Sequence, residues 1–292
     1  MAILVNRNTV FITCGFTGHQ GTFHSLQARD YGSLFAGGVT PGKGGTIHEG
    51  FPVFNTVSDA VGKTHANAAL IFVPPTQAAD SIIECIEAEL DLVVCITDGI
   101  PTRDMLRIKS YLDRSKTKLI GPNSPGVITP GESKLGIMPG HIFMPGRVGI
   151  ISRSGTLSYD IVQLLSQHEI GQSTCVGIGA DLISGTNFID VLKLFNDDAD
   201  TDAVLIIGEI GGISETEAAK WLKTNMKKPV LCFMAGIHAP RGKRLGHTGA
   251  IVYGKEESVD EKMKILKDCG IRVVESINDI PEALKIVIKK ED

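Results

Sequence analysis

His247 lies between two glycines in a strongly basic segment, APRGKRLGHTGAIV at 239–252, and follows Arg241, Lys243 and Arg244. A neutral imidazole is a good nucleophile toward a γ-phosphoryl group near pH 7, and nearby cations offset the negative charge that a phosphoryl group adds. The flanking glycines let substrate and backbone approach closely. This pattern predicts a histidine that carries a phosphoryl group. The alternative is a solvated histidine in a surface loop.

Two other segments of the same half follow expected strands and could serve that phosphoryl group. Ser154, Gly155 and Thr156 open an expected helix, whose exposed N–H groups and dipole favour an anion, although ordinary N-capping explains the same residues. Glu209, in GEIGG at 208–212, can accept a hydrogen bond from the imidazole nitrogen that does not attack, or can cap the next helix. Because all these segments follow strands of one domain, we expect them at one edge of its sheet.

A glycine-rich turn, GFTGHQG at 15–21, joins an expected strand to an expected helix. Its glycines bring backbone N–H groups and a positive helix end close to an anion, which predicts a phosphate site; a tight turn without ligand is the alternative. The spacing is GxxGxxG rather than GxGxxG, and the next strand ends in 37–40 without an acidic residue for a ribose. NAD is therefore disfavoured.

The segment GGVTPGKGG at 37–45 contains most of a P-loop, but Gly44 stands where a Ser or Thr would hold magnesium. An NTP-hydrolysing P-loop is thus disfavoured, and Lys43 becomes a point charge suited to a phosphate, or simply a solvated lysine. The loops at 73–75 and 96–98 follow further expected strands. They are expected to rim the same crevice, because ligands of open α/β sheets bind beyond the carboxyl ends of the strands.

Apolar strand-like runs alternate with helical stretches on either side of a Gly/Pro-rich connection at 121–146, in which no continuous helix or central strand is expected. The alternation predicts parallel βαβ units, and hence an α/β fold of two domains. We expect a Rossmann-like domain over 1–125 and a flavodoxin-like, doubly wound parallel-sheet domain over 126–292. Helices are expected near 20–31, 57–66, 76–89, 102–115, 155–168, 187–195, 214–226 and 257–268, with one more at the end.

Composition excludes several classes of protein. Of the 292 residues, 29 are Lys or Arg and 33 are Asp or Glu, so the net charge of −4 creates no field that gathers nucleic acid or anionic membrane. No apolar run is long enough to span a bilayer. The six cysteines contain no CxxC pair, which disfavours a disulfide framework and a structural zinc site and favours a reducing compartment. We expect no metal site in the chain.

Taken together, GFTGHQGTFHS, GGVTPGKGG and ITDGIP resemble the CoA-binding domain of succinyl-CoA synthetase α-subunits. The segments GPNSPGVITPGE, PGRVGIISRSGTLSYD, GEIGG and KRLGHTGAI resemble the rest of that family, so the likeness spans nearly the whole chain. It implies a CoA-binding domain over 1–125 and a phosphohistidine-bearing ligase domain over 126–292.

The resemblance also implies roles for single residues. In the first domain, the residues implied to contact CoA are Thr17, Gly18, His19 and Gln20 around the diphosphate, Lys43 on a phosphate, and Ile96, Thr97 and Asp98. In the second domain, the resemblance makes His247 the phosphorylated residue, Glu209 its hydrogen-bonding partner, and Tyr159 a neighbour of the carboxylate substrate near a subunit interface. This chain departs from many relatives at His19 and Asp98, where they carry Ser and Glu, at Ser124, where they carry Cys, and over 253–258.

The family mechanism has three reversible transfers: nucleotide phosphorylates the histidine, succinate takes the phosphoryl group, and the CoA thiol displaces phosphate to give succinyl-CoA. This chain has no complete P-loop, kinase signature or obvious magnesium carboxylate cluster. The resemblance therefore implies a β-subunit with an ATP-grasp domain, which binds the Mg-nucleotide, ATP or GTP, and supplies a second helix N-terminus. It also implies the cytoplasm for a bacterial chain, or the mitochondrial matrix for a processed eukaryotic one.

Three alternative functions share parts of these patterns. A sister CoA ligase acting on another carboxylate, such as malate, shares every motif above. A non-catalytic CoA-binding regulatory protein would keep the fold but acquire no phosphate on His247. A dinucleotide dehydrogenase is the weakest alternative, because the fingerprint spacing and the acidic ribose residue are both absent.

Overall fold

A computed structural model describes residues 2–236 and 258–288. The chain forms two compact units. The N-terminal unit contains Leu4–Met138 and Ile183–Thr186, and the C-terminal unit contains Pro139–Leu182, the residues from Asn187 onward and the first residues of the chain.

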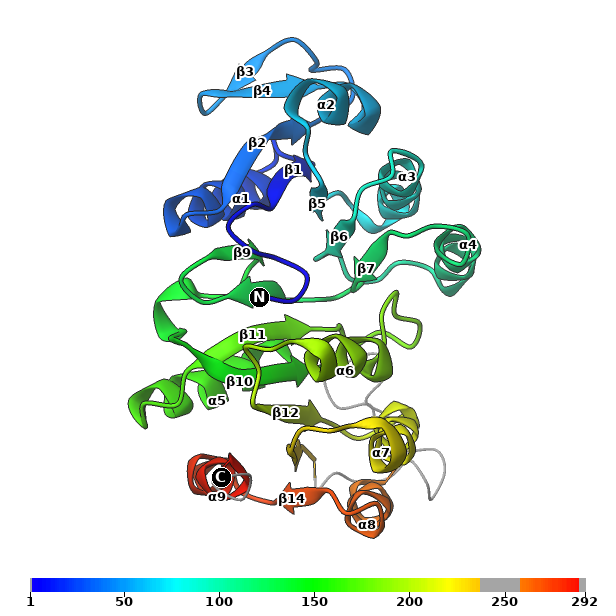
Figure 1. Ribbon diagram of the computed structural model, residues 1–292. Helices are drawn as coiled ribbons and strands as arrows, with labels where there is room; N and C mark the ends of the chain where they lie inside the picture. The colour runs from blue at the N-terminus through cyan, green and yellow to red at the C-terminus, as the bar shows by residue number, and fades with distance from the viewer. Residues whose placement is uncertain (1, 237–257, 289–292) are drawn as a thin grey trace. The chain divides into compact units, whose positions relative to one another are not determined.

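The N-terminal unit is built on a sheet with the strand order β3-β4-β2-β1-β5-β6-β7. Its strands are β1 (Val10–Cys14), β2 (Leu34–Val39), β3 (Ile47–His48), β4 (Phe51–Phe54), β5 (Ala68–Ile71), β6 (Leu92–Cys95) and β7 (Lys118–Ile120). All pairings are parallel except that between β3 and β4. The helices are α1 (His19–Tyr31), α2 (Val57–Thr64), α3 (Pro75–Glu87) and α4 (Thr102–Leu112). In Figure 1, α2, α3 and α4 follow one another on one face of the sheet and α1 covers the other.

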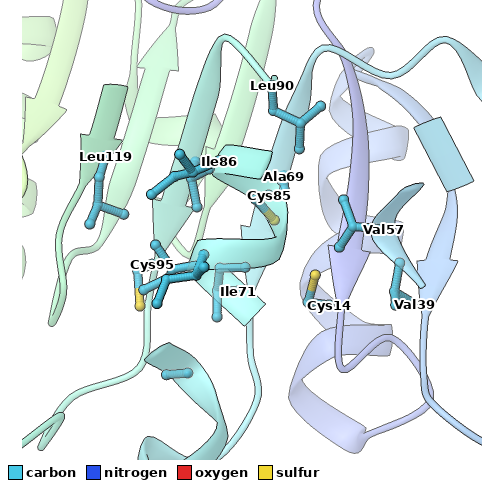
Figure 2. Packing of buried hydrophobic residues seen from close by; sticks show 14 of the residues in the cluster. Cys14, Val39, Val57, Ala69, Ile71, Cys85, Ile86, Leu90, Cys95 and Leu119 are labelled. Atoms are coloured by element: carbon cyan, nitrogen blue, oxygen red, sulfur yellow. The ribbon is translucent and has the colours of Figure 1, made fainter. Parts of the chain in front are cut away.

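The apolar runs of β1, β5 and β6 form the centre of this unit because both faces of the sheet are covered by helices. Figure 2 shows the packing of α3 against the sheet, with Ile71, Cys85 and Cys95 among the buried side chains. The cluster is apolar apart from thiols, and Ile71, Cys85 and Cys95 are fully buried. The core therefore holds the strand ends rigidly beneath the loops that follow them.

The hairpin of β3 and β4 was not expected from the sequence. Its turn is Glu49 and Gly50, both with positive φ (49° and 81°), and Ile47 pairs with Pro52. A two-residue turn with two positive φ angles matches the right-handed twist of the flanking strands, and glycine in its second position is the usual signal. The two-residue strand β3 is too short to stand out in the sequence.

The segment 121–146 is more ordered than we expected. It contains β8 (Gly126–Thr129) and β9 (Ser133–Gly136), paired antiparallel, and the short 3₁₀ helix η1 (Gly140–Ile142). Gly126 and Gly136 face each other in this hairpin, and a Cβ on Gly126 would lie 2.1 Å from the carbonyl oxygen of Leu135. These glycines serve close backbone approach within a strand pair, not an irregular loop.

The C-terminal unit has its own parallel strands, in the order β14-β13-β12-β10-β11. They are β10 (Pro145–Ser152), β11 (Gln172–Gly177), β12 (Ala203–Gly208), β13 (Val230–Met234) and β14 (Arg272–Val274). The helices are α5 (Gly155–Gln167), α6 (Phe188–Asp197), α7 (Ser214–Asn225), α8 (Val259–Asp268), η3 (Ile277–Asp279) and α9 (Ile280–Ile288). Helices α5 and α9 lie on one face, and α6, α7 and α8 on the other (Figure 1). The predicted α/β fold with mostly parallel sheets is confirmed.

Candidate functional site

The glycine turn, the Lys43 loop and the loops at 73–75 and 96–98 follow β1, β2, β5 and β6, which are parallel neighbours in one sheet. Backbone hydrogen bonds join the loops at their bases: Gly15 N–H donates to Val39 at 2.9 Å, and Ile96 N–H to Ile71 at 3.2 Å. The structure therefore brings the four predicted segments to one edge of the sheet.

The turn after β1 is shaped by the absence of side chains. Gly15 has a φ of +86°, and its carbonyl accepts a hydrogen bond from Gly18 N–H at 3.0 Å. A Cβ on Gly21 would lie 2.3 Å from the Gly15 carbonyl oxygen, closer than real side chains come. Helix α1 begins directly behind this turn with exposed His19 and Gln20. Its first N–H groups have no intrahelical acceptor and so are available to an anion.

Lys43 extends from the loop after β2 to the same turn, where its Nζ donates a hydrogen bond to the Thr17 hydroxyl at 3.1 Å. Lys43 is exposed, as a lysine that meets a ligand from solvent must be. Asn55, which follows β4, shapes this loop, because its Oδ1 accepts from Gly42 N–H and from Gly44 N–H, each at 2.9 Å. Sequence reasoning missed Asn55, since a single asparagine after a strand carries no distinctive signal.

The other two loops are joined by Thr97, whose hydroxyl donates to the Val73 carbonyl at 2.7 Å. Ile96 and Thr97 are partly buried, whereas Asp98 is exposed at the rim. Ser124 is buried, and its hydroxyl accepts from Gly126 N–H at 2.9 Å. The hydroxyl of Thr97 therefore holds the two loops together, whereas the side chain of Asp98 is exposed to solvent.

In the C-terminal unit, the ends of β10 and β12 are neighbours, with Ser152 paired to Ile207. Ser154 is the N-cap of α5: its side chain accepts from Leu157 N–H at 3.4 Å. Ser154 thus has the N-capping role that is the alternative explanation of this segment. The N–H groups of Gly155 and Thr156, in the first turn of α5, have no acceptor within the helix. Thr156 is exposed and Gly155 partly buried.

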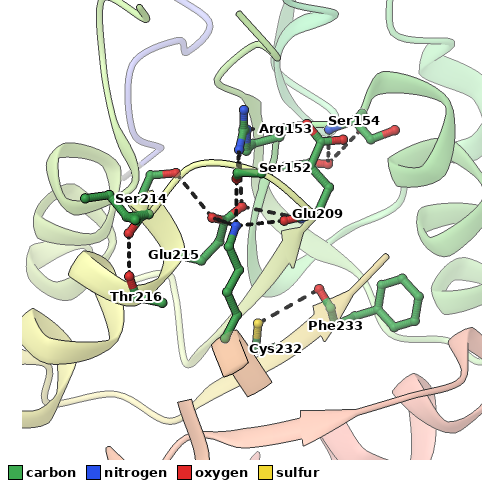
Figure 3. A network of polar contacts seen from close by, with 12 residues as sticks. Ser152, Arg153, Ser154, Glu209, Ser214, Glu215, Thr216, Cys232 and Phe233 are labelled. Carbon is green, nitrogen blue, oxygen red and sulfur yellow. Dashed lines mark hydrogen bonds and ion pairs between the residues drawn. The ribbon is translucent and has the colours of Figure 1, made fainter. Parts of the chain in front are cut away.

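Glu209 follows β12 and is 6% exposed. It does not cap the next helix, because the N-cap of α7 is Ile213, without a side-chain hydrogen bond. Its Oε1 instead lies 3.5 Å from Nε of Arg153, which follows β10. Figure 3 shows Arg153, Glu209 and Glu215 in one network, and Ser152 and Ser154, which bond each other, beside it. The structure therefore brings Glu209 and the Ser154 segment together, through an arginine that sequence reasoning did not single out.

Tyr159 lies in α5, and its hydroxyl is buried without a hydrogen-bond partner among residues 2–236 and 258–288. Burial raises the pKa of this phenol, and the nearby Cys175 thiol adds to the shift. The hydroxyl is therefore a neutral hydrogen-bond donor at physiological pH.

His247, together with Arg241, Lys243 and Arg244, lies outside the described residues. Strand β13, which precedes these residues in the sequence, is the neighbour of β12. Directly after β13, the Ala235 N–H donates to the Gly208 carbonyl at 2.9 Å. Within the described ranges no cluster of three His, Cys, Asp or Glu residues can hold a metal ion. Those same ranges contain no helix with the length and apolarity that crossing a membrane requires.

Two family models match the chain: "CoA binding domain" over residues 6–99 and "CoA-ligase" over 151–269. The ADP-forming succinate–CoA ligase subunit alpha of Staphylococcus epidermidis is 52% identical over 290 residues, which are 99% of this chain and 96% of that protein. Its counterpart in Staphylococcus aureus is also 52% identical, over 97% of this chain and 94% of that protein.

Among solved structures, an ATP citrate lyase from Methanosaeta concilii in complex with citryl-CoA matches with a TM-score of 0.90 at 22% identity. It covers 99% of this chain, which spans only 51% of that longer protein. The likeness at that identity concerns the fold alone. The identity to the staphylococcal proteins over nearly the full length decides the family: this chain belongs to the α-subunits of the ADP-forming succinate–CoA ligases.

Proposed function

We propose that this chain is the CoA-binding, phosphoryl-carrying subunit that ligates succinate and CoA to succinyl-CoA with cleavage of ATP to ADP. The staphylococcal relatives carry that activity in their names. The observation that carries the proposal is the junction of the glycine turn with the Lys43 loop, where the lysine ammonium lies 3.1 Å from the Thr17 hydroxyl. This junction places a cation beside the turn from which α1 begins.

The glycine turn fits the diphosphate of CoA. The first turn of α1 has no side-chain cap hydrogen bond, so its N–H groups are available to an anion, and a helix N-terminus stabilises negative charge. Thr17, Gly18, His19 and Gln20 would surround the diphosphate, and Lys43 would pair with one phosphate. Ile96, Thr97 and Asp98 would line the next part of the ligand. His19 replaces a serine common in relatives, which a contact made by the backbone N–H tolerates.

In the C-terminal unit we assign the phosphoryl carrier to His247. Its imidazole nitrogen attacks the γ-phosphorus of ATP and ADP leaves; a succinate oxygen then attacks that phosphorus and frees the imidazole. The acyl carbon of succinyl phosphate finally accepts the CoA sulfur, with release of phosphate and of the thiol proton. Glu209 would hold the second imidazole nitrogen, and the first turn of α5 at Ser154, Gly155 and Thr156 would receive the phosphoryl oxygens. The Tyr159 hydroxyl would donate a hydrogen bond to a succinate carboxylate.

The partner in this proposal is a β-subunit that binds Mg-ATP, as an α-subunit of a ligase implies. In the described ranges no acidic cluster offers a magnesium site. We therefore expect the isolated chain to bind CoA but not to turn over. The bacterial relatives favour a cytoplasmic location.

The test is to incubate the α–β complex with γ-labelled ATP and to map any acid-labile, base-stable phosphate by mass spectrometry. Label on His247, lost in His247→Ala, supports the proposal, and succinate should discharge it faster than malate does. A complex that binds CoA but takes up no label would instead favour a CoA-binding regulatory protein. Equal discharge by malate would favour a sister ligase.

A further inference from the structure

Four ionisable side chains converge behind the turn that carries Glu209. They come from four different places in the C-terminal unit: Arg153 after β10, Glu209 after β12, Glu215 in α7 and Lys262 in α8. The side chains of Glu215 and Lys262 are 0% exposed, and those of Arg153 and Glu209 are 8% and 9% exposed. Two cations and two carboxylates thus share one buried cluster, three of whose members, Arg153, Glu209 and Glu215, are labelled in Figure 3. We call these four residues the buried charge cluster.

The Lys262 ammonium donates three hydrogen bonds, two to the 209–211 backbone and one to Glu215. Its Nζ donates to the Glu209 carbonyl at 2.9 Å, to the Gly211 carbonyl at 2.8 Å and to Oε2 of Glu215 at 2.6 Å. An ammonium has three donors, and all three are satisfied here by protein acceptors, with the Lys262 side chain 0% exposed. The side chain of Lys262 therefore fixes the carbonyl groups of Glu209 and Gly211, on either side of Ile210.

Glu215 and Arg153 hold the same turn from the other sides. Oε1 of Glu215 accepts from the Glu209 N–H at 3.3 Å and lies 3.6 Å from Nη1 of Arg153. That Nη1 also donates to the Gly211 carbonyl at 3.2 Å. Both backbone groups of Glu209 and one of Gly211 are thus bound by side chains from other elements. Gly211 and Gly212 have positive φ angles of 83° and 64°, which glycine adopts without strain, so the turn is flexible in sequence and the side-chain contacts are what restrain it.

Stability alone is a weak reason for such a cluster. Removing charges from water is costly, and a buried ion pair is often no more stable than apolar side chains of the same volume. What the cluster supplies, and apolar side chains cannot, is directed hydrogen bonds to the 209–211 backbone. A carboxylate that must orient an imidazole gains from a backbone held in one place.

We propose that Lys262 and Glu215, with Arg153, are positioning residues for the ligase reaction, because they fix the 209–212 turn and with it the carboxylate that orients the phosphorylated histidine. They touch no substrate and act through Glu209. The inference rests on the proposed function, in which Glu209 serves His247.

The first experiment measures the turn itself and does not depend on activity. Amide hydrogen exchange over residues 208–213 is followed by mass spectrometry in the α–β complex of wild type, Lys262→Met and Lys267→Met. Lys267 is the matched control, since it lies in the same helix and pairs with Glu275 at 3.7 Å, but on the exposed surface. We expect faster exchange of the turn in Lys262→Met only. Unchanged exchange in that variant would overturn the proposal.

The second experiment separates positioning from folding. Removing one member of a buried pair leaves an uncompensated charge, whereas replacing both members by apolar residues recovers stability. The double variant Glu215→Leu/Lys262→Met should therefore recover the unfolding midpoint lost in Lys262→Met. Its rate of His247 phosphorylation by saturating labelled ATP should nevertheless stay about 10- to 100-fold below wild type, with an unchanged CoA affinity.

The outcomes are distinct. A double variant that recovers phosphorylation together with stability means that the cluster only supports folding, and the proposal is wrong. A wild-type complex without label contradicts the proposed function, while the exchange experiment still decides whether the cluster fixes the turn. The single variant Glu209→Gln provides the reference rate for loss of the carboxylate that the cluster is inferred to position.

Discussion

Two candidate functional turns of this chain, the glycine turn after β1 and the Glu209 turn after β12, both follow parallel strands but are built by opposite means. The turn after β1 is shaped by missing side chains: a Cβ at Gly21 would lie 2.3 Å from the Gly15 carbonyl. The turn after β12 is shaped by side chains, since Lys262, Glu215 and Arg153 bind its backbone.

The difference follows from what each turn must present. A diphosphate can be bound by backbone N–H groups, so close approach is the requirement, and one exposed lysine adds charge. A carboxylate that orients an imidazole must itself be held, so its backbone needs contacts from behind. The first site should therefore be sensitive to added volume, and the second to the loss of a single charge.

The largest expected effect tests the second site. Glu215→Leu leaves Lys262 and Arg153 with one carboxylate instead of two in a buried cluster, and should lower the free energy of unfolding of the C-terminal unit by about 3–5 kcal/mol. Trp221, the one tryptophan of the sequence, lies in α7 of that unit and reports its urea unfolding by fluorescence.

The control is Glu275→Leu, which removes an exposed partner of Lys267 and should cost at most about 1 kcal/mol. Similar losses of unfolding free energy in the two variants would mean that the buried charges stabilise the unit no more than exposed ones do. The contrast between the two turns would then be wrong.

The next effect tests the first site by volume. Gly21→Ala must displace the Gly15 carbonyl, a rearrangement of backbone that typically costs about 1–3 kcal/mol. Because the displaced turn is the proposed diphosphate site, the Kd for CoA should rise about tenfold, as calorimetric titration would show. Gly62→Ala in α2 is the matched control, since its Cβ meets open space, and should leave the Kd unchanged. Unaltered CoA binding in Gly21→Ala would refute the assigned site.

A smaller effect is expected from charge at the first site. Lys43 is exposed, so Lys43→Met should raise the Kd for CoA only about fivefold at low salt, and less as the salt concentration rises. The same change at Lys118, exposed at the start of β7, is the control and should do nothing. A loss that ignores salt would show that Lys43 acts through the loop structure rather than through its charge.

The smallest effect comes from His24, which stacks on Phe72 with 5.5 Å between ring centroids. Burial, with a smaller contribution from the Lys134 charge, lowers the pKa of His24 to about 4. The unfolded chain, with a histidine pKa near 6.5, binds the extra proton first, so stability should fall as pH drops from about 6.5 to about 4. His24→Gln should reduce the pH dependence of the thermal unfolding midpoint over that window. His168→Gln, a change at an exposed position, should leave that dependence as it is in the wild type. Equal slopes in all three proteins would contradict the shift.

Much of the fold follows from local patterns in the sequence. The expected helix near 20–31 is α1 (His19–Tyr31), and the one near 102–115 is α4 (Thr102–Leu112). Both helices follow short apolar runs. The change from a strand-like apolar run to a helical spacing of apolar residues is a strong signal of a βα unit. The strand-end positions of Lys43, Thr97, Ser154 and Glu209 follow from the same reasoning, because each comes directly after such a run. The hairpin at 47–54 and the strands at 126–136 were missed because they are short and rich in glycine and proline.

Sequence alone determined most of the alternation of strands and helices, the glycine turn, the position of Glu209 after a buried strand, and the family. Only the tertiary structure decided that Asn55 shapes the Lys43 loop and that Lys262, 53 residues beyond Glu209, binds its carbonyl. A lysine in an amphipathic helix is ordinarily solvated, so nothing in its neighbourhood marks it as buried. Patterns report contacts that repeat along the chain, whereas these contacts arise where distant segments meet.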